Sequence, residues 1–385
     1  MTAGASRRRA AIAGVAESDL GKTPQHTVLS QQAQAATAAL KESGLGFGDV
    51  DALFCAGNMG FAPPMAMAEY LGLQVDWLDG TNIGGSSFEA HVGHAAAAIE
   101  AGMIDVALIT YGSTQRTDRS RGAAGPATLG SQFERPYGLP MPVGAYALAA
   151  MRHMHSYGTT SEQLAEIAVS ARDWALLNPK AFHHGSGKLT VDDVLASGFI
   201  AEPLHKLDCC LVTDGGGAVV MVAEDRWADL AVRPVEVLGH AETSTHAQIS
   251  EMPDVTVTGA ARSGPEALKR AGVSHADIDL LAIYDSFTIT VLMTLESLGF
   301  CKPGEGADFV AGGRTGPGGE IPMNTNGGGL SYCHPGMYGI FLLIEAARQL
   351  RGECGDRQVD GAELALVNGT GGVLSSTSTV ILGRG

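Results

Sequence analysis

His334 is the first residue whose type and setting could do chemistry. It follows Cys333 and precedes Pro335-Gly336, in a glycine-rich stretch that predicts a turn into a helix. An imidazole there can donate a hydrogen bond to a thioester or enolate oxygen as half of an oxyanion hole, although it could also only cap the helix. Cys333 could supply a nucleophile or be a small packing thiol. Tyr332 and Tyr338, on either side, could each supply a second phenol.

A tyrosine and an aspartate follow the apolar run Leu280–Ile283, which is predicted to be a strand. Ligands of α/β proteins commonly bind beyond the carboxyl ends of strands. Tyr284 could therefore donate to a substrate oxygen or act as a general acid or base, and Asp285 could orient the site. The alternatives are a buried structural tyrosine and an aspartate that caps a turn.

Two further segments are rich in glycine and small polar residues. Gly84 and Gly85 open a predicted helix, whose backbone amides and dipole could face a bound group, or they could allow close packing. Ser86 is predicted to cap that helix or to contact the substrate. Asn324 and Asn326 begin the second segment, where they could contact a substrate or stabilise the turn.

The elements that must position these residues are duplicated. The stretch 39–53 recurs at 267–281 as a helix end, a glycine stop, an acidic turn and an apolar strand. The matching residues are Ala39, Leu40, Lys41, Gly44, Asp49, Asp51 and Leu53, and then Ala267, Leu268, Lys269, Gly272, Asp277, Asp279 and Leu281. Strands that alternate with helices predict parallel sheets, so the repeat predicts an α/β protein with two similar α/β/α halves.

One segment interrupts this pattern. Residues 120–203 are predicted to form an inserted loop domain, because they keep apolar periodicity around a helix at Ser161–Leu177. Ser161 with Glu162 is predicted to start that helix. The first half then comprises residues 1–119 and 204–233, and the C-terminal half comprises residues 234–385.

Composition excludes several classes of protein. A formal charge of −16 argues against a broad nucleic-acid interface. We find no apolar run long enough to span a bilayer and no secretory signal. Six cysteines without a CxxC pair are typical of reduced cytosolic thiols, so the sequence predicts a cytoplasmic protein. The adjacent His183 and His184 lack spaced partners, so no metal site is predicted.

Several motifs together resemble those of the thiolase superfamily. The segment Asn324–Gly329 followed by His334-Pro335-Gly336 is similar to the NxxGG…GHPxGxxG segment of that family. Tyr284-Asp285-Ser286-Phe287 resembles the HDCF element of the sterol-carrier-protein type of thiolase. Asp208-Cys209-Cys210 and the segment 214–218 resemble the strand entry of the same branch. The resemblance covers essentially the whole chain.

The departures from the family pattern concern its two cysteines. The alignment of Asn82 and Ala90 with the family motif places Gly84 where the acyl-accepting cysteine stands. The second family cysteine is also missing, because the stretch that should carry it reads Asn368–Gly372 here. Gly371 within this stretch is expected to contact the substrate. The pattern is similar to the thiolase-like, lipid-transfer-protein branch that includes steroid side-chain aldolases.

The resemblance implies a five-layered thiolase fold and an acyl-CoA substrate, with coenzyme A as part of that substrate and no permanent cofactor. It also implies a homodimer and a small OB-fold, zinc-ribbon companion protein. The expected function is formation or cleavage of a carbon–carbon bond by aldolase-type chemistry without a covalent acyl-cysteine. Two alternatives stay open: an acyltransferase with thiolase activity that uses a substitute nucleophile such as Cys333, and a non-catalytic lipid- or acyl-CoA-binding subunit.

Overall fold

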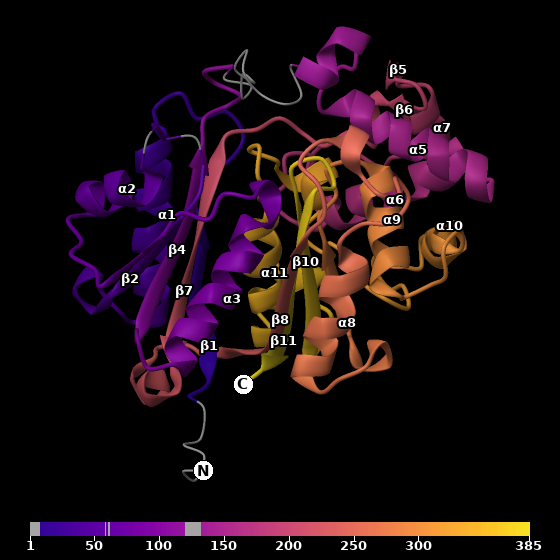
Figure 1. Cartoon of the computed structure of the whole chain (residues 1–385). Coiled ribbons are helices and arrows are strands. Elements are labelled where there is room, and N and C mark those ends of the chain that lie inside the picture. The colour runs from indigo at the N-terminus through magenta and orange to yellow at the C-terminus, as the bar shows by residue number, and fades with distance from the viewer. Residues whose placement is uncertain (1–7, 58, 61, 120–131) are drawn as a thin grey trace.

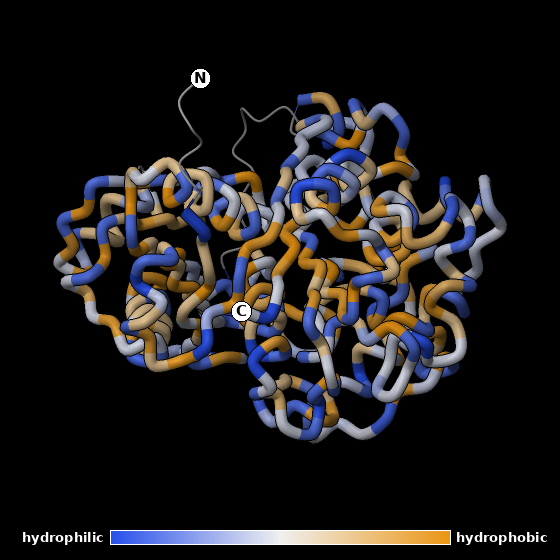
Figure 2. The backbone as a smooth tube through the Cα atoms, turned by 90° about the horizontal axis from the view of Figure 1, so that it is seen from below, coloured by the Kyte–Doolittle hydropathy of each residue, from blue (hydrophilic) through white to orange (hydrophobic). Residues whose placement is uncertain are grey.

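The computed structural model describes residues 8–57, 59–60, 62–119 and 132–385 (Figure 1). Within these ranges nine strands form one mixed sheet in the order β3-β2-β4-β7-β1-β8-β11-β10-β9. Apolar segments run through the middle of the molecule (Figure 2). None of the helices in these ranges is long and apolar enough to cross a membrane.

Five strands of the sheet come from the first half of the fold. They are β1 (Ala10–Glu17), β2 (Ala52–Cys55), β3 (Trp77–Asp79), β4 (Val106–Ser113) and β7 (Gly215–Ala223). Two helices cover their outer face, α1 (Val28–Ser43) and α2 (Pro63–Leu71). Thr27 starts α1 with a reciprocal capping box, and Gly44 ends it at φ +84°, a conformation that favours glycine.

The second half repeats this local design. Its strands are β8 (Val235–Ser244), β9 (Leu280–Ile283), β10 (Leu364–Gly371) and β11 (Ser376–Arg384). Its outer helices are α8 (Ala260–Ala271), α9 (Thr288–Leu298) and α10 (Gly306–Val310). As α1 does before β2, α8 ends at a left-handed glycine, Gly272, and a 3-10 turn leads into β9. The order of elements predicted from the repeat is confirmed.

Two helices lie between the halves. The helix α3 (Ser87–Glu100) contacts β1, β4 and β7 on one side and β8, β10 and β11 on the other. The helix α11 (Gly339–Arg351) contacts strands of both halves in the same way, and Figure 1 shows both helices in the middle of the molecule. The order helix, sheet, helix, sheet, helix is therefore present, and the expected thiolase-type α/β fold is confirmed.

The prediction of parallel sheets was wrong in part. Among the strands of the described residues, only the pairs β2–β3, β2–β4 and β9–β10 are parallel, and the neighbours of β7, β8 and β11 are antiparallel. In addition, Ala11 and Ile12 of β1 pair with Glu236 and Val235 of β8 and join the two half-sheets. β10 and β11 run antiparallel because a short turn, not a helix, connects them.

Helices from the interrupting segment lie at one end of the molecule (Figure 1). They are α5 (Val143–Tyr157), α6 (Ser161–Leu176) and α7 (Val191–Leu195), followed by the small hairpin of β5 (Phe199–Ala201) and β6 (Leu204–His205). Thr160, one residue before the predicted start, caps α6 through its hydroxyl. The ring of Tyr146 in α5 packs on Phe287, with centroids 4.3 Å apart, so this layer touches the segment that carries Tyr284.

Candidate active site

A tyrosine and a histidine from different segments meet in the buried centre of the C-terminal half. Tyr284 directly follows β9, and His334 lies in the turn before α11. The Tyr284 hydroxyl lies 3.0 Å from His334 Nε2 and accepts the backbone N–H of Tyr338 at 3.0 Å. Both side chains are buried. The structure therefore brings together two of the residues that were predicted from the sequence to be catalytic.

Burial sets the charge of this pair. It lowers the pKa of His334 to about 4 and raises the pKa of the Tyr284 phenol well above its usual value. Both groups are therefore neutral near pH 7. When Nε2 carries no proton, the Tyr284 hydroxyl donates a hydrogen bond to it. The pair is then uncharged before the reaction and is arranged to transfer a proton.

The first half of the fold holds the turn of His334 in place. Thr213 Oγ1 accepts the backbone N–H of His334 at 3.0 Å, and the N–H of Thr213 donates to the His334 carbonyl at 3.2 Å. Tyr111, in β4, donates its hydroxyl to the carbonyl of Pro335 and accepts the N–H of Met337 at 3.1 Å. The position of the imidazole thus depends on both halves.

Asp285 forms hydrogen bonds to the glycine turn. Its carboxylate accepts the backbone N–H groups of Gly329 at 2.6 Å and Leu330 at 3.2 Å, at the start of a π-helical turn (Gly328–Tyr332). Burial raises the pKa of Asp285 to about 7. This geometry makes Asp285 a group that shapes the turn leading to His334.

The two asparagines contact the backbone and Tyr338. Asn324 has φ +51°, and its amide accepts from and donates to the backbone of Ile283 at 2.8 Å, which fixes the end of β9 before Tyr284. Asn326 Oδ1 accepts the Tyr338 hydroxyl at 2.8 Å and the N–H of Gly328 at 2.9 Å. Asn324 therefore positions the backbone before Tyr284, and Asn326 positions the neighbouring Tyr338.

The glycine-rich start of α3 lies directly against this pair. A β-carbon added at Gly85 would fall 2.6 Å from Tyr284 Cζ, so the phenol ring packs on the bare backbone. Ser86 is fully buried, and its hydroxyl lies 2.8 Å from that of Ser376. A β-carbon at Gly371 would lie 2.7 Å from Ser86 Oγ. Gly85, Ser86 and Gly371 thus form one close contact between α3 and the last two strands.

Gly84, the position of the family cysteine, has no room for a side chain. It adopts φ +78°, and a β-carbon there would fall 2.5 Å from Gly372 N and 2.9 Å from Gly371 Cα. We therefore expect Gly84→Cys to destabilise the fold by about 1–3 kcal/mol. We also expect no acylated protein by intact mass after incubation with acyl-CoA. An acyl adduct on the introduced thiol, in a protein of parental stability, would contradict this reading.

Of the three remaining candidates, Cys333, Tyr332 and Tyr338, only one contacts Tyr284. Cys333 is fully buried, and burial raises the pKa of its thiol well above the usual value, so the geometry favours the packing thiol over the nucleophile. Tyr332 donates its hydroxyl to Glu17 Oε1 at 2.8 Å. Tyr338, in contrast, packs edge-on against Tyr284 with centroids 5.7 Å apart. Of the two extra phenols, only Tyr338 joins the pair.

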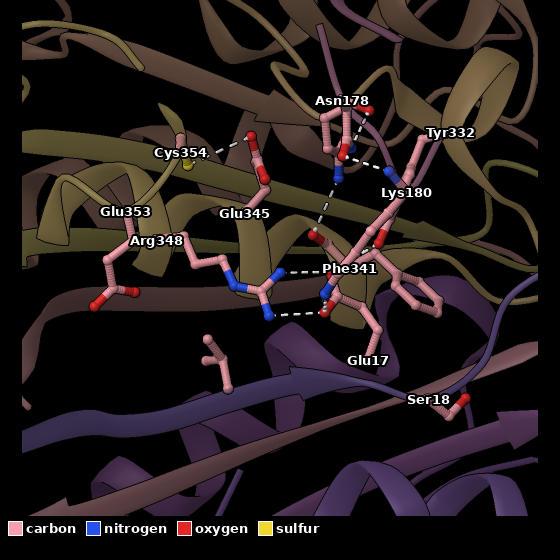
Figure 3. Close-up of polar contacts among 12 residues, drawn as sticks. Glu17, Ser18, Asn178, Lys180, Tyr332, Phe341, Glu345, Arg348, Glu353 and Cys354 are labelled. Carbon is pink, nitrogen blue, oxygen red and sulfur yellow. Dashed lines mark hydrogen bonds and ion pairs between the residues drawn. The ribbon is translucent and has the colours of Figure 1, made fainter. Parts of the chain in front are cut away.

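An ionic cluster that the sequence did not predict contacts the hydroxyl of Tyr332 (Figure 3). Arg348 of α11 binds Glu17 at the end of β1 through two contacts of 2.5 and 2.7 Å, and Lys180 Nζ lies 2.9 Å from the same carboxylate. Burial opposes ionisation of Glu17, but Arg348 and Lys180 outweigh it and hold its pKa well below the usual value. The cluster joins both halves and the interrupting segment.

The structure also identifies Thr213 and Tyr111, which the sequence reading did not select. Tyr111 stands near the carboxyl end of β4, a location that could have selected it. Thr213 has no such signal, because its contact with His334 joins residues far apart in the chain. Among the described residues, no three His, Cys, Asp or Glu side chains converge to hold a metal ion.

Known proteins are similar to this sequence over most of its length. A family model described as "Thiolase C-terminal domain-like" matches residues 241–384. The 17-hydroxy-3-oxo-4-pregnene-20-carboxyl-CoA lyase of Mycobacterium tuberculosis is 35% identical, over 97% of this chain and 99% of the lyase. A steroid side-chain-cleaving aldolase of Thermomonospora curvata is 34% identical, over 97% of each chain. An acetyl-CoA acetyltransferase of Methanothermobacter thermautotrophicus is 32% identical, over 98% of this chain and 100% of the relative.

Solved structures agree with these relatives. The "Ltp2-ChsH2(DUF35) aldolase" superposes with a TM-score of 0.89 at 33% identity, over 97% of each chain. An SCP2-thiolase-like protein of Mycobacterium smegmatis superposes with a TM-score of 0.75 at 21% identity, over 99% of this chain and 78% of that one, and shows the fold alone. Sequence, site and fold agree: the chain belongs to the thiolase superfamily, in its SCP2-thiolase-like branch.

Proposed function

We propose that this protein is an enzyme that cleaves, or in reverse forms, a carbon–carbon bond in an acyl-CoA by aldolase chemistry without a covalent acyl-cysteine. One observation carries the proposal. The buried Tyr284–His334 pair lies against a helix start where glycine replaces the family cysteine and leaves no room for one. The relatives named as a lyase and as an aldolase support it.

The pair suits the proton transfers of a retro-aldol reaction. Tyr284 accepts the proton of the substrate hydroxyl as it passes its own proton to His334 Nε2, across the 3.0 Å contact. The carbon–carbon bond breaks, the hydroxyl carbon becomes a carbonyl, and the bonding electrons form the enolate of the shortened thioester. Backbone N–H groups and the phenol stabilise the enolate oxygen. A proton then adds to the enolate carbon, so no net proton is consumed.

The proposed substrates are 3-hydroxyacyl-CoA thioesters, including those of steroids with a shortened side chain. The names of two relatives describe a steroid carboxyl-CoA lyase and a steroid side-chain-cleaving aldolase, which supports this class. The neutral site also fits, because a buried pair without charge tolerates an apolar substrate around the reacting hydroxyl.

We also propose two protein partners and a cytoplasmic location. The structure that superposes at 0.89 is named as a complex with a DUF35 partner, which supports a small OB-fold, zinc-ribbon companion. A second copy of this chain is proposed to pair along β3, which ends the sheet and exposes Leu78. The free thiols of all six cysteines suit a reducing cytoplasm.

The proposal is tested with a panel of 3-hydroxyacyl-CoA thioesters, with and without a zinc-ribbon OB-fold companion protein. We expect mass spectrometry to detect a shortened acyl-CoA and a released ketone or aldehyde, without consumption of free CoA. Consumption of CoA by a 3-ketoacyl-CoA would favour the acetyltransferase reading, which the archaeal relative represents. Binding of every thioester without turnover would favour a non-catalytic subunit.

A further inference from the structure

Glu89 is a buried carboxyl group that the reaction described above does not use. It lies in α3, one turn after Gly85, and is 1% exposed. Within the described part of the chain, neither of its carboxyl oxygens has a hydrogen-bond partner. A buried polar group without a partner costs free energy, so its presence beside a reaction site points to a use.

Three glycines place this carboxyl close to Tyr284. A β-carbon at Gly339 would fall 2.5 Å from Glu89 Oε2 and would also collide with the Gly85 carbonyl, and one at Gly369 would collide with the same carboxyl. Gly85 in turn lies beneath the ring of Tyr284. Glu89 and the ring of Tyr284 therefore both lie close to the backbone of Gly85.

Glu89 also borders a cavity of about 510 Å³ between α3, β8 and α8. Glu89 lines this cavity together with Gly93 and His94 of α3 and His240 of β8. Its outer part is formed by side chains that are partly exposed to solvent, such as Glu242 and Arg270 at about half. The cavity thus connects solvent with Glu89.

The groups that face Glu89 across the cavity set its charge environment. They are His94 on α3, His240 and Glu242 on β8, and Arg262, Glu266 and Arg270 on α8. A hydrogen bond to Asp79 raises the pKa of His94 to about 9, whereas burial lowers the pKa of His240. On the side of the site the Glu89 carboxyl lies against Gly339 and Gly369, which carry no charge. Burial raises the pKa of Glu89 itself to about 8, so it can both hold and exchange a proton near neutral pH.

We infer that Glu89 acts through a bridging water as a proton relay between solvent in this cavity and the enolate formed at the Tyr284–His334 pair. The inference rests on the proposed function. Protonated Glu89 passes a proton through a bridging water to the enolate carbon, and cavity water returns a proton to the carboxylate. The proton that His334 took from the hydroxyl leaves to solvent with the product, so the protons balance.

The test compares Glu89→Gln with the parent and with Glu296→Gln. Glutamine keeps the size of the side chain but cannot relay a proton. We expect kcat for the cleaved 3-hydroxyacyl-CoA to fall at least about tenfold with KM changed less than about twofold, because only proton transfer is lost. The parent should lose kcat above a pH of about 8, and the variant should not show this loss. The melting temperature of Glu89→Gln at pH 8 should rise, because the raised pKa of the buried carboxyl costs stability above its unfolded pKa of about 4.5 and glutamine does not ionise.

Glu296 is a matched buried carboxyl that is fully paired, to His153 at 3.0 Å and to the N–H of Gly306 at 2.9 Å. Glu296→Gln should lower the melting temperature and leave kcat within about twofold. A second variant, Glu89→Ala, should recover part of its kcat when formate is added, because the cavity admits a small carboxylic acid.

The outcomes separate this inference from the proposed function. If the parent cleaves its substrate and Tyr284→Phe does not, then an unchanged kcat and pH profile in Glu89→Gln overturns the relay alone. Loss of kcat in Glu89→Ala without any rescue by formate also overturns it. A parent that cleaves none of the thioesters overturns the proposed function and the relay with it.

Discussion

Tyr284→Phe should lower kcat by about 10²- to 10⁴-fold, because it removes the hydroxyl that links the substrate to His334. The ring and its packing on Gly85 remain, so the fold should keep its stability to within about 1 kcal/mol. His334→Ala should lose a similar factor, because it removes the group that takes the proton across the 3.0 Å contact. The measurement is single-turnover cleavage of a 3-hydroxyacyl-CoA that the parent cleaves.

Tyr332→Phe provides a matched control for this prediction. Tyr332 is also a buried phenol, in the turn that leads to His334, but its hydroxyl binds Glu17 and not His334. We expect its kcat to stay within about threefold of the parent, with a loss of about 1 kcal/mol of stability. If Tyr332→Phe and Tyr284→Phe lost activity equally, the special role of the Tyr284–His334 contact would be refuted.

Glu17→Gln should destabilise the fold by about 3–5 kcal/mol, because it leaves Arg348 buried without its counter-charge. Arg348 makes two short contacts to this carboxylate, and the side chains are 14% and 5% exposed (Figure 3). The measurement is the free energy of unfolding at pH 7 by denaturant titration. The control is Glu320→Gln, which breaks the exposed pair with Arg314 and should cost less than about 1 kcal/mol.

The same pair predicts how stability depends on pH. The pKa of Glu17 is held below its usual value in the folded protein, so its contribution is fully present above the unfolded pKa of about 4.5. It is lost progressively as the pH falls below that value. The parent should therefore lose more stability than Glu17→Gln between about pH 5 and pH 3. Equal losses in both proteins would show that Glu17 does not act as a charged partner of Arg348.

The duplicated architecture could be predicted because its signals are local. The glycines that end α1 and α8, and the acidic turns before β2 and β9, occupy equivalent places in each copy of the repeat. The order of strands within the sheet was less accessible. The antiparallel course of β7 and β11 depends on which distant strand each one pairs with, and the sequence contains no local pattern for that choice.

The site was predictable to a similar extent. Tyr284 and His334 stand beside motifs, so their meeting could be anticipated from the resemblance to a family. The roles of Asp285 and Asn324 could not be anticipated, because aspartate and asparagine are equally common at turns. Here both side chains bind backbone groups. Glu17 and Glu89 were missed because only the packing of the two halves places them next to partners or glycines distant in the chain.

One measurement tests most directly whether the protein cleaves a carbon–carbon bond without an acyl-enzyme. The protein and its companion are mixed with a 3-hydroxyacyl-CoA, and the products, free CoA and protein mass are followed together. We predict one ketone or aldehyde and one shortened acyl-CoA per substrate, constant free CoA and no change in protein mass. Consumption of CoA together with an acylated peptide containing Cys333 would contradict the account and establish acyl transfer in its place.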